Sequence, residues 1–218
     1  MQMAMAKRFL RERTRFLDMT EPLESTEVIP STYCKDNTTV RFFVEPLVAI
    51  RATMDQVYKI VQEWIADVEK QSAGDPILYH VNETLSETVS QRRLIRTAGD
   101  HNKEPLVVES NTVTYSEYDR ENEVGLLVSR FVDRDDLRPY RPNERLRRDV
   151  TSLMMVSQET PLNTEDPPVI VITGWFSTRQ RRGLVAMSRD DDVQLLSNHM
   201  NAWCDAKLRY LRDTLRHL

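Results

Sequence analysis

The chain has 218 residues, 40% of them apolar and 29% charged, and its 30 Lys and Arg against 34 Asp and Glu leave a net charge of −4. This length suits one domain with a sizeable core, and the balanced charge argues against nucleic-acid binding. The longest apolar run, Val169 to Ile172, is far too short to span a bilayer, and Cys34 and Cys204 do not form a disulfide framework. We therefore expect a cytoplasmic protein.

The N-terminal 17 residues are rich in Arg, contain Glu12 as their one acid, and could form a short basic amphipathic helix. Three interpretations stay open: a mitochondrial-type presequence, the end of a longer helical region, or an arm without a specific role. Residues 18–37 contain Pro22 and Pro30 and show no clear periodicity, which predicts a linker over the surface. We expect an arm and linker over 1–37 and a domain over 38–218.

The domain is predicted to open with a strand and a helix. Val40, Phe42 and Val44 alternate with polar positions before Pro46, which indicates a strand with a bend. Thr53 with Gln56 three residues later then matches a capping box. Apolar residues at helical spacing follow from 57 to 68 and predict a helix that ends near residue 74.

A region of period two follows for about a hundred residues and predicts five or six antiparallel strands. The predicted strands are 77–81, 84–97, 106–118, 124–132, 146–156 and 169–177. Turn-forming residues separate them at 99–100, 119–122, 139–143 and 161–168, so we expect hairpin connections.

The chain is predicted to close with one long amphipathic helix from Val193 to Leu218. Ser188 and Asp191 fit a capping box, and three consecutive aspartates precede the helix, where negative charge is favourable. Its apolar stripe consists of Leu196, Met200, Trp203, Cys204, Leu208, Leu211, Leu215 and Leu218. Strand, helix, meander and closing helix in this order predict an α+β fold, not a parallel doubly wound sheet.

These features resemble the START-like (helix-grip, SRPBCC-type) family, in which a curved antiparallel sheet wraps a long C-terminal α-helix. The resemblance covers about residues 39–218 and lies in Arg41-Phe-Phe-Val-Glu-Pro-Leu47, Met54-Asp-Gln-Val-Tyr-Lys-Ile60, Gly125-Leu-Leu-Val-Ser-Arg-Phe-Val-Asp133 and Thr173-Gly-Trp-Phe-Ser177. The layout is most similar to the divergent START-like proteins of water moulds (oomycetes), in which a basic segment often precedes the domain.

The resemblance implies binding of a lipid or other apolar small molecule between sheet and helix, for transfer or sensing, with possible transient membrane contact and no cofactor. Strand parity gives the candidate lining residues Val113, Tyr115, Val128, Val150, Met154, Ile172 and Phe176, faced by Met200 and Trp203 from the closing helix. The alternative is that these side chains pack into a filled core that acts only through protein contacts. The oligomeric state also stays open.

Three charged residues share a strand face with apolar residues: Glu117, Arg130 and Arg148. A buried charge needs a partner or a purpose, and an Arg offers a fork for phosphate or carboxylate, so these residues are candidates for binding a head group. The alternative is that they lie near strand ends and reach water.

Familiar catalytic motifs are absent from the sequence, whose five glycines and four histidines are scattered. We therefore expect no metal site and no phosphate-binding glycine loop. Because relatives of the helix-grip fold include cyclases and hydrolases, an enzyme stays open as an alternative. Its candidate acid and base residues are Tyr115, Glu117 and Arg130.

Overall fold

The computed structural model describes residues 2–30, 37–48, 51–71, 76–98, 106–160, 168–181, 205–206 and 208–216. In chain order these form α1 (Gln2–Thr14), β1 (Leu23–Pro30), β2 (Asn37–Leu47), α2 (Met54–Gln71), β3 (Ile77–Ser86), β4 (Val89–Ala98), β5 (Leu106–Asp119), β6 (Val124–Phe131), β7 (Leu146–Glu159) and β8 (Val169–Arg181). Residues 205–206 and 208–215 are helical and are called the C-terminal segment below.

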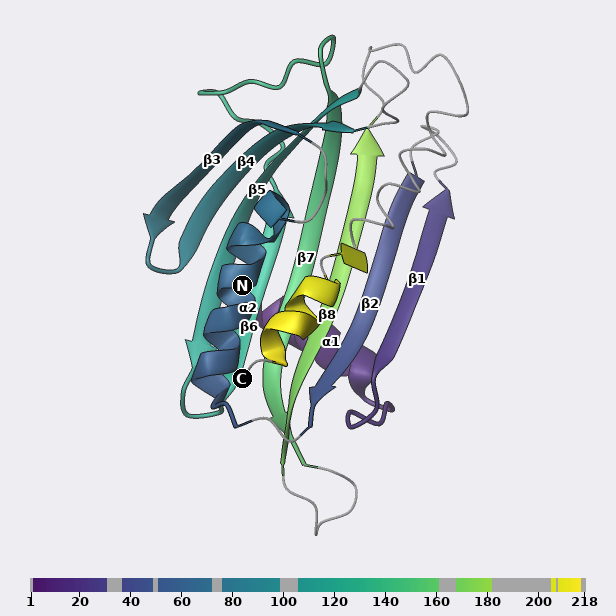
Figure 1. The fold of residues 1–218 in the computed structure, drawn as a ribbon, viewed down its shortest axis with the longest axis vertical. Coiled ribbons are helices and arrows are strands. Elements are labelled where there is room, and N and C mark those ends of the chain that lie inside the picture. Colours follow the sequence, from purple (N-terminus) through teal and green to yellow (C-terminus); the bar gives the residue numbers. More distant parts are fainter. Residues whose placement is uncertain are drawn as a thin grey trace.

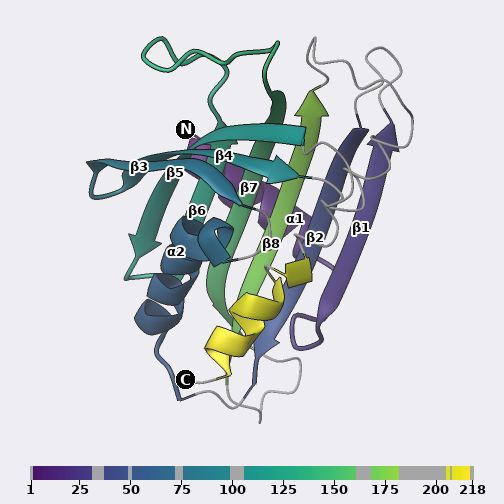
Figure 2. The same ribbon diagram turned by 45° about the horizontal axis from the view of Figure 1, so that its top comes forward.

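The strands form one curved eight-stranded sheet in the order β1-β2-β8-β7-β6-β5-β4-β3, with antiparallel neighbours throughout. A short parallel contact also joins β5 to β7. Figure 1 shows β1 and β3 at the two edges, and Figure 2 shows β3 and β4 crossing steeply over the end of the sheet. The predicted α+β class is confirmed.

Helices cover both faces of this sheet (Figure 1). Helix α2 contacts β6 and β7 on one face, and α1 contacts β6, β7 and β8 on the other. We call these the inner and the outer face. None of the described helices has both the length and the apolar character that crossing a membrane requires.

The inner face carries the main core, which joins α2, the sheet and the C-terminal segment. The predicted capping box starts α2: the Gln56 backbone N–H donates to Thr53 Oγ1 at 3.3 Å, and the Thr53 N–H donates to Gln56 Oε1 at 2.8 Å. The buried core residues are Phe43, Leu47, Met54, Val57, Tyr58, Val61, Trp64, Ile65, Leu127, Met154, Val156, Ile172, Leu208, Leu211 and Leu215. Burial of each large apolar side chain contributes about 1.5–3 kcal/mol.

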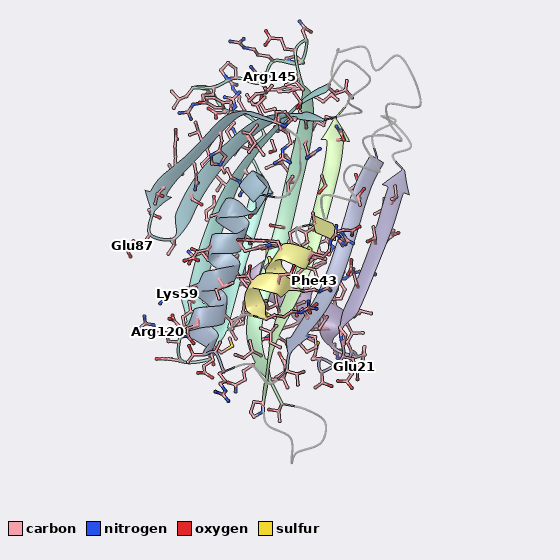
Figure 3. All side chains as sticks on the ribbon, viewed as in Figure 1. Glu21, Phe43, Lys59, Glu87, Arg120 and Arg145 are labelled. Atoms are coloured by element: carbon pink, nitrogen blue, oxygen red, sulfur yellow. The ribbon has the colours of Figure 1, made fainter. Side chains whose placement is uncertain are left out.

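Two glycines let aromatic rings lie directly on the strand backbone. A Cβ atom at Gly125 would stand 2.1 Å from the Tyr58 ring, and one at Gly174 would stand 2.1 Å from the Phe43 ring. Such distances are far inside van der Waals contact, so both positions require the absence of a side chain. Phe43 lies beneath the C-terminal segment in Figure 3.

The outer face carries a second core, built with α1. Ala6 and Leu10 pack against Val124, Leu126, Val128 and Met155, and the Phe9 ring meets the Trp175 ring edge-on at 5.4 Å. The expected amphipathic helix is therefore present, with its apolar side on the sheet.

The predicted linker over residues 18–37 is wrong for Leu23–Pro30, which pair along β2 as an edge strand. Apolar and polar residues do not alternate here, because this edge strand has exposed side chains on both faces, Val28 and Ile29 among them. The strand is held instead by its backbone hydrogen bonds to β2. That residues 38–218 form a domain by themselves stays a prediction.

The predicted strand over 84–97 is also corrected, because the chain turns back within it. β3 ends at Ser86 and β4 begins at Val89, so Glu87 and Thr88 form the turn. The turn has no Gly, Pro or Asn to mark it, and the Ser86 hydroxyl accepts the Thr88 N–H at 3.3 Å instead.

Candidate functional site

The register of the sheet assigns each predicted site residue to a face, since directly opposed residues of antiparallel strands point to the same side. Leu127 belongs to the inner core, whereas Val128 packs with α1. Val128 opposes Tyr115, Arg130 opposes Val113, and Leu126 opposes Glu117.

Five predicted site residues therefore lie on the outer face, away from the C-terminal segment: the lining candidates Val113, Tyr115 and Val128 and the head-group candidates Glu117 and Arg130. The prediction that they line an inner cavity is wrong, because the outer face of β6 is apolar in order to receive α1. Three of these residues, Tyr115, Glu117 and Arg130, are also the acid and base candidates of the enzymatic alternative.

Five others lie on the inner face: Arg148, Val150, Met154, Ile172 and Phe176. Met154 and Ile172 are fully buried in the core, and Phe176 stacks on Phe43 with ring centroids 5.9 Å apart. Arg148 and Val150 are buried near the start of β7. Contact of these residues with a ligand stays a prediction. Met200 and Trp203 fall outside the described residues.

A cavity of about 190 Å³ opens on the inner face, between α2 and the β3–β4 hairpin. We call it the hairpin cavity. It is lined by Gln62, Ile65, Ala66, Asn82, Thr84, Ser86, Glu87, Thr88, Val89, Ser90, Arg92, Thr114, Ser116 and Leu127. Figure 3 shows Glu87, one of the lining residues, at the tip of the hairpin. The sequence did not point to these residues.

The polar side chains around the hairpin cavity are held by specific contacts. Gln62 Nε2 donates to Ser116 Oγ at 3.3 Å, which ties α2 to β5. The Arg92 guanidinium donates to the backbone oxygens of Ile65 and Ala66, at 3.2 Å for the latter. Arg92 therefore directs its charge at the carbonyls of α2.

Tyr58 lies next to Ser116 of the hairpin cavity and stays neutral at physiological pH. Burial raises the pKa of Tyr58 from 10.0 to about 12, although hydrogen bonding to Ser116 acts in the opposite direction. Its ring stacks on Tyr118 with centroids 5.1 Å apart. The Tyr58 hydroxyl is therefore uncharged where it meets Ser116, a lining residue of the hairpin cavity.

A larger hollow of about 630 Å³ lies on the outer side, between β3, β4 and the loop that follows β6. Its rim residues Leu78 and Leu137 are 56% and 88% exposed, so it is an open groove. Ligand sites bury most of their ligand, and such a groove would leave it largely in water.

Two buried carboxylates, Glu109 and Asp149, are each paired with arginines. Arg145 Nη1 lies 2.9 Å from Glu109, which also pairs with Arg93 at 2.7 Å. The buried Asp149 accepts from Arg147 at 2.7 Å and from Arg181. These pairs connect β4 with β5 and β7 with β8.

A second ionic cluster fastens the C-terminal segment to the β1–β2 edge. Arg41 donates to both Glu24 and Asp205, and Arg212 Nε donates to Glu45 at 2.8 Å. This cluster joins β1, β2 and the C-terminal segment across the inner face. Among the described residues, no group of His, Cys, Asp and Glu is suited to hold a metal ion.

No protein-family model and no curated protein matches the chain. A solved STAR-related lipid transfer protein (fragment 25–204) from Xanthomonas axonopodis is similar with a TM-score of 0.50 and 13% identity, over 88% of this chain and 98% of that one. The human StarD13 lipid transfer and protein localization domain is similar with a TM-score of 0.47 and 11% identity, over 99% of this chain and 96% of that domain. The Zhui aromatase/cyclase from a Streptomyces species is similar with a TM-score of 0.34 and 10% identity, over 88% of this chain and 93% of that one.

At these identities, likeness concerns the fold and not the ligand or the reaction, and the likeness to proteins of water moulds stays a prediction. The curved antiparallel sheet, the helix α2 on its inner face and the similarity to the Xanthomonas protein together show that the chain has a START-like α+β fold.

Proposed function

We propose that the protein binds an amphiphilic small molecule on the inner face of its sheet, with one end in the hairpin cavity, and that it carries or senses this molecule. The observation that supports the proposal most is the cavity itself, which combines the apolar residues Ile65, Ala66 and Leu127 with a wall of hydroxyl and amide groups. A pocket of this kind suits a molecule with an apolar body and a polar end.

The volume of about 190 Å³ limits what the hairpin cavity encloses. Typical small-molecule pockets measure roughly 300–1,000 Å³, so this one would take a ring or the end of a chain. In the proposal, the C-terminal segment is the end of the long helix expected from residue 193, and that helix covers the rest of the ligand. Transient membrane contact would load a poorly soluble molecule.

Purification followed by native mass spectrometry and solvent extraction tests this proposal. We expect a defined small molecule with the parent protein and its loss from Ser90→Trp, because Ser90 lines the hairpin cavity and an indole would fill it. The matched control is Glu117→Trp, which puts the same side chain on the exposed outer face of β5. An equal amount of bound molecule in both folded variants would contradict the proposal.

A further inference from the structure

Hydroxyl side chains of five adjacent strands stand in one row across the inner face. Thr84 of β3 opposes Ser90 of β4, Ser90 opposes Thr114 of β5, Thr114 opposes Ser129 of β6, and Ser129 opposes Ser152 of β7. We call these residues the hydroxyl row. The next row contains Leu127 opposite Met154 and belongs to the apolar core.

The hydroxyl row runs from the hairpin cavity into the interior. Thr84, Ser90 and Thr114 line the cavity, whereas Ser129 and Ser152 are only 3% and 4% exposed. The Thr114 and Ser129 hydroxyls lie 2.9 Å apart and bond to each other. Burying a row of hydroxyls beside an apolar core is unfavourable unless they find partners.

The row is uncharged and can both donate and accept hydrogen bonds. Two of the described lining residues are charged: Arg92 donates to α2 carbonyl oxygens, and Glu87 lies at the exposed hairpin tip. An anionic head group in this position would lose its hydration and meet, among the described residues, no guanidinium fork directed at it. A neutral hydroxyl or carbonyl group would find partners of matching polarity.

We propose that the polar end of the ligand is an uncharged hydroxyl or carbonyl group bound by the hydroxyl row, with the apolar part of the ligand on Ile65 and Leu127. This inference rests on the proposed function and names the ligand class of the same cavity. Buried hydroxyls that the ligand fails to satisfy carry a penalty, so the site discriminates against an analogue that lacks the group.

Three probes that share one ring system test the inference: 2-naphthol, naphthalene and 2-naphthoate, measured by their own fluorescence or by calorimetry. We expect 2-naphthol to bind at least about tenfold more tightly than the other two, the effect of one satisfied hydrogen bond in a buried site. Tightest binding of 2-naphthoate, or equal binding of 2-naphthol and naphthalene, would overturn the inference while leaving a binding cavity. Binding of none of the three, with no molecule extracted from the purified protein, would overturn the proposed function as well.

The double variant Thr114→Val/Ser129→Ala assigns the preference to the row. It removes both partners of one hydrogen bond, which disturbs folding less than removing one of them. We expect it to abolish the preference for 2-naphthol over naphthalene while both still bind. Thr151→Val is the control, because Thr151 opposes Ser177 on the outer face of β7. A preference that survives in the double variant refutes the role of the row.

Discussion

Leu10→Ala should destabilise the whole fold, although Leu10 lies in the segment that the sequence suggested was an arm. Leu10 is 0% exposed and packs in the outer core with Val124, Leu126 and Val128 of β6. Replacing a fully buried Leu by Ala costs about 2–5 kcal/mol, because the transfer free energy of the lost atoms adds to that of the cavity left behind. For 218 residues, a loss of about 3 kcal/mol lowers the Tm by roughly 6–12 °C.

The assay is urea unfolding followed by tryptophan fluorescence and far-ultraviolet circular dichroism in parallel. The control is Met5→Ala, since Met5 lies on the same helix but is 65% exposed, and its loss should cost less than about 0.5 kcal/mol. A Leu10→Ala variant as stable as Met5→Ala would refute the packing of α1 on the sheet. The N-terminal 17 residues would then be an arm.

Three further predictions test the inner face. Gly125→Ala should lower the free energy of unfolding in denaturant by about 1–3 kcal/mol, since its methyl group would enter the Tyr58 ring. Adding Tyr58→Leu to the same chain should recover part of that loss. An unchanged free energy of unfolding in the single variant would contradict the close contact. Arg41→Ala removes the contacts to Glu24 and Asp205, so hydrogen exchange of residues 208–215 should accelerate at least about fivefold, whereas unchanged exchange would show that the cluster does not hold the segment. The pKa of Tyr58 is raised from 10.0 to about 12, so its contribution to stability is present below pH 10 and falls as the pH rises towards 12; Tyr58→Phe should flatten that part of the stability curve, and an unchanged slope would argue against its burial.

Local sequence signals predicted those parts of the fold that depend on neighbouring residues. The capping box at Thr53 and Gln56 forms as expected, and the alternation along β7 and β8 correctly placed Met154 and Ile172 on the inner face. The apolar residues of α2 recur at helical spacing and pack in the main core, so their spacing reports the buried face of the helix directly.

Strands β5 and β6 were assigned to the wrong face because parity alone does not say which side is inner. The run from Val124 to Val128 is apolar at nearly every position, the pattern of a strand covered on both faces. That run, together with the amphipathic character of residues 1–17, was the available signal that a second helix packs on the outer face.

The hairpin cavity and the hydroxyl row depend on register, which the sequence does not specify. Ser90, Thr114 and Ser129 are far apart in the chain and ordinary for exposed strand positions, and only the pairing of three strands brings them into line. The contact of Arg41 with Asp205 likewise joins residues separated by 164 positions.

A crystal structure of the protein with 2-naphthol bound tests the central claim most directly. The account predicts electron density for the probe in the hairpin cavity, with its rings on Ile65 and Leu127 and its oxygen within hydrogen-bond distance of Thr114. Density in the outer groove at Leu78 and Leu137, with the hairpin cavity empty, would contradict it.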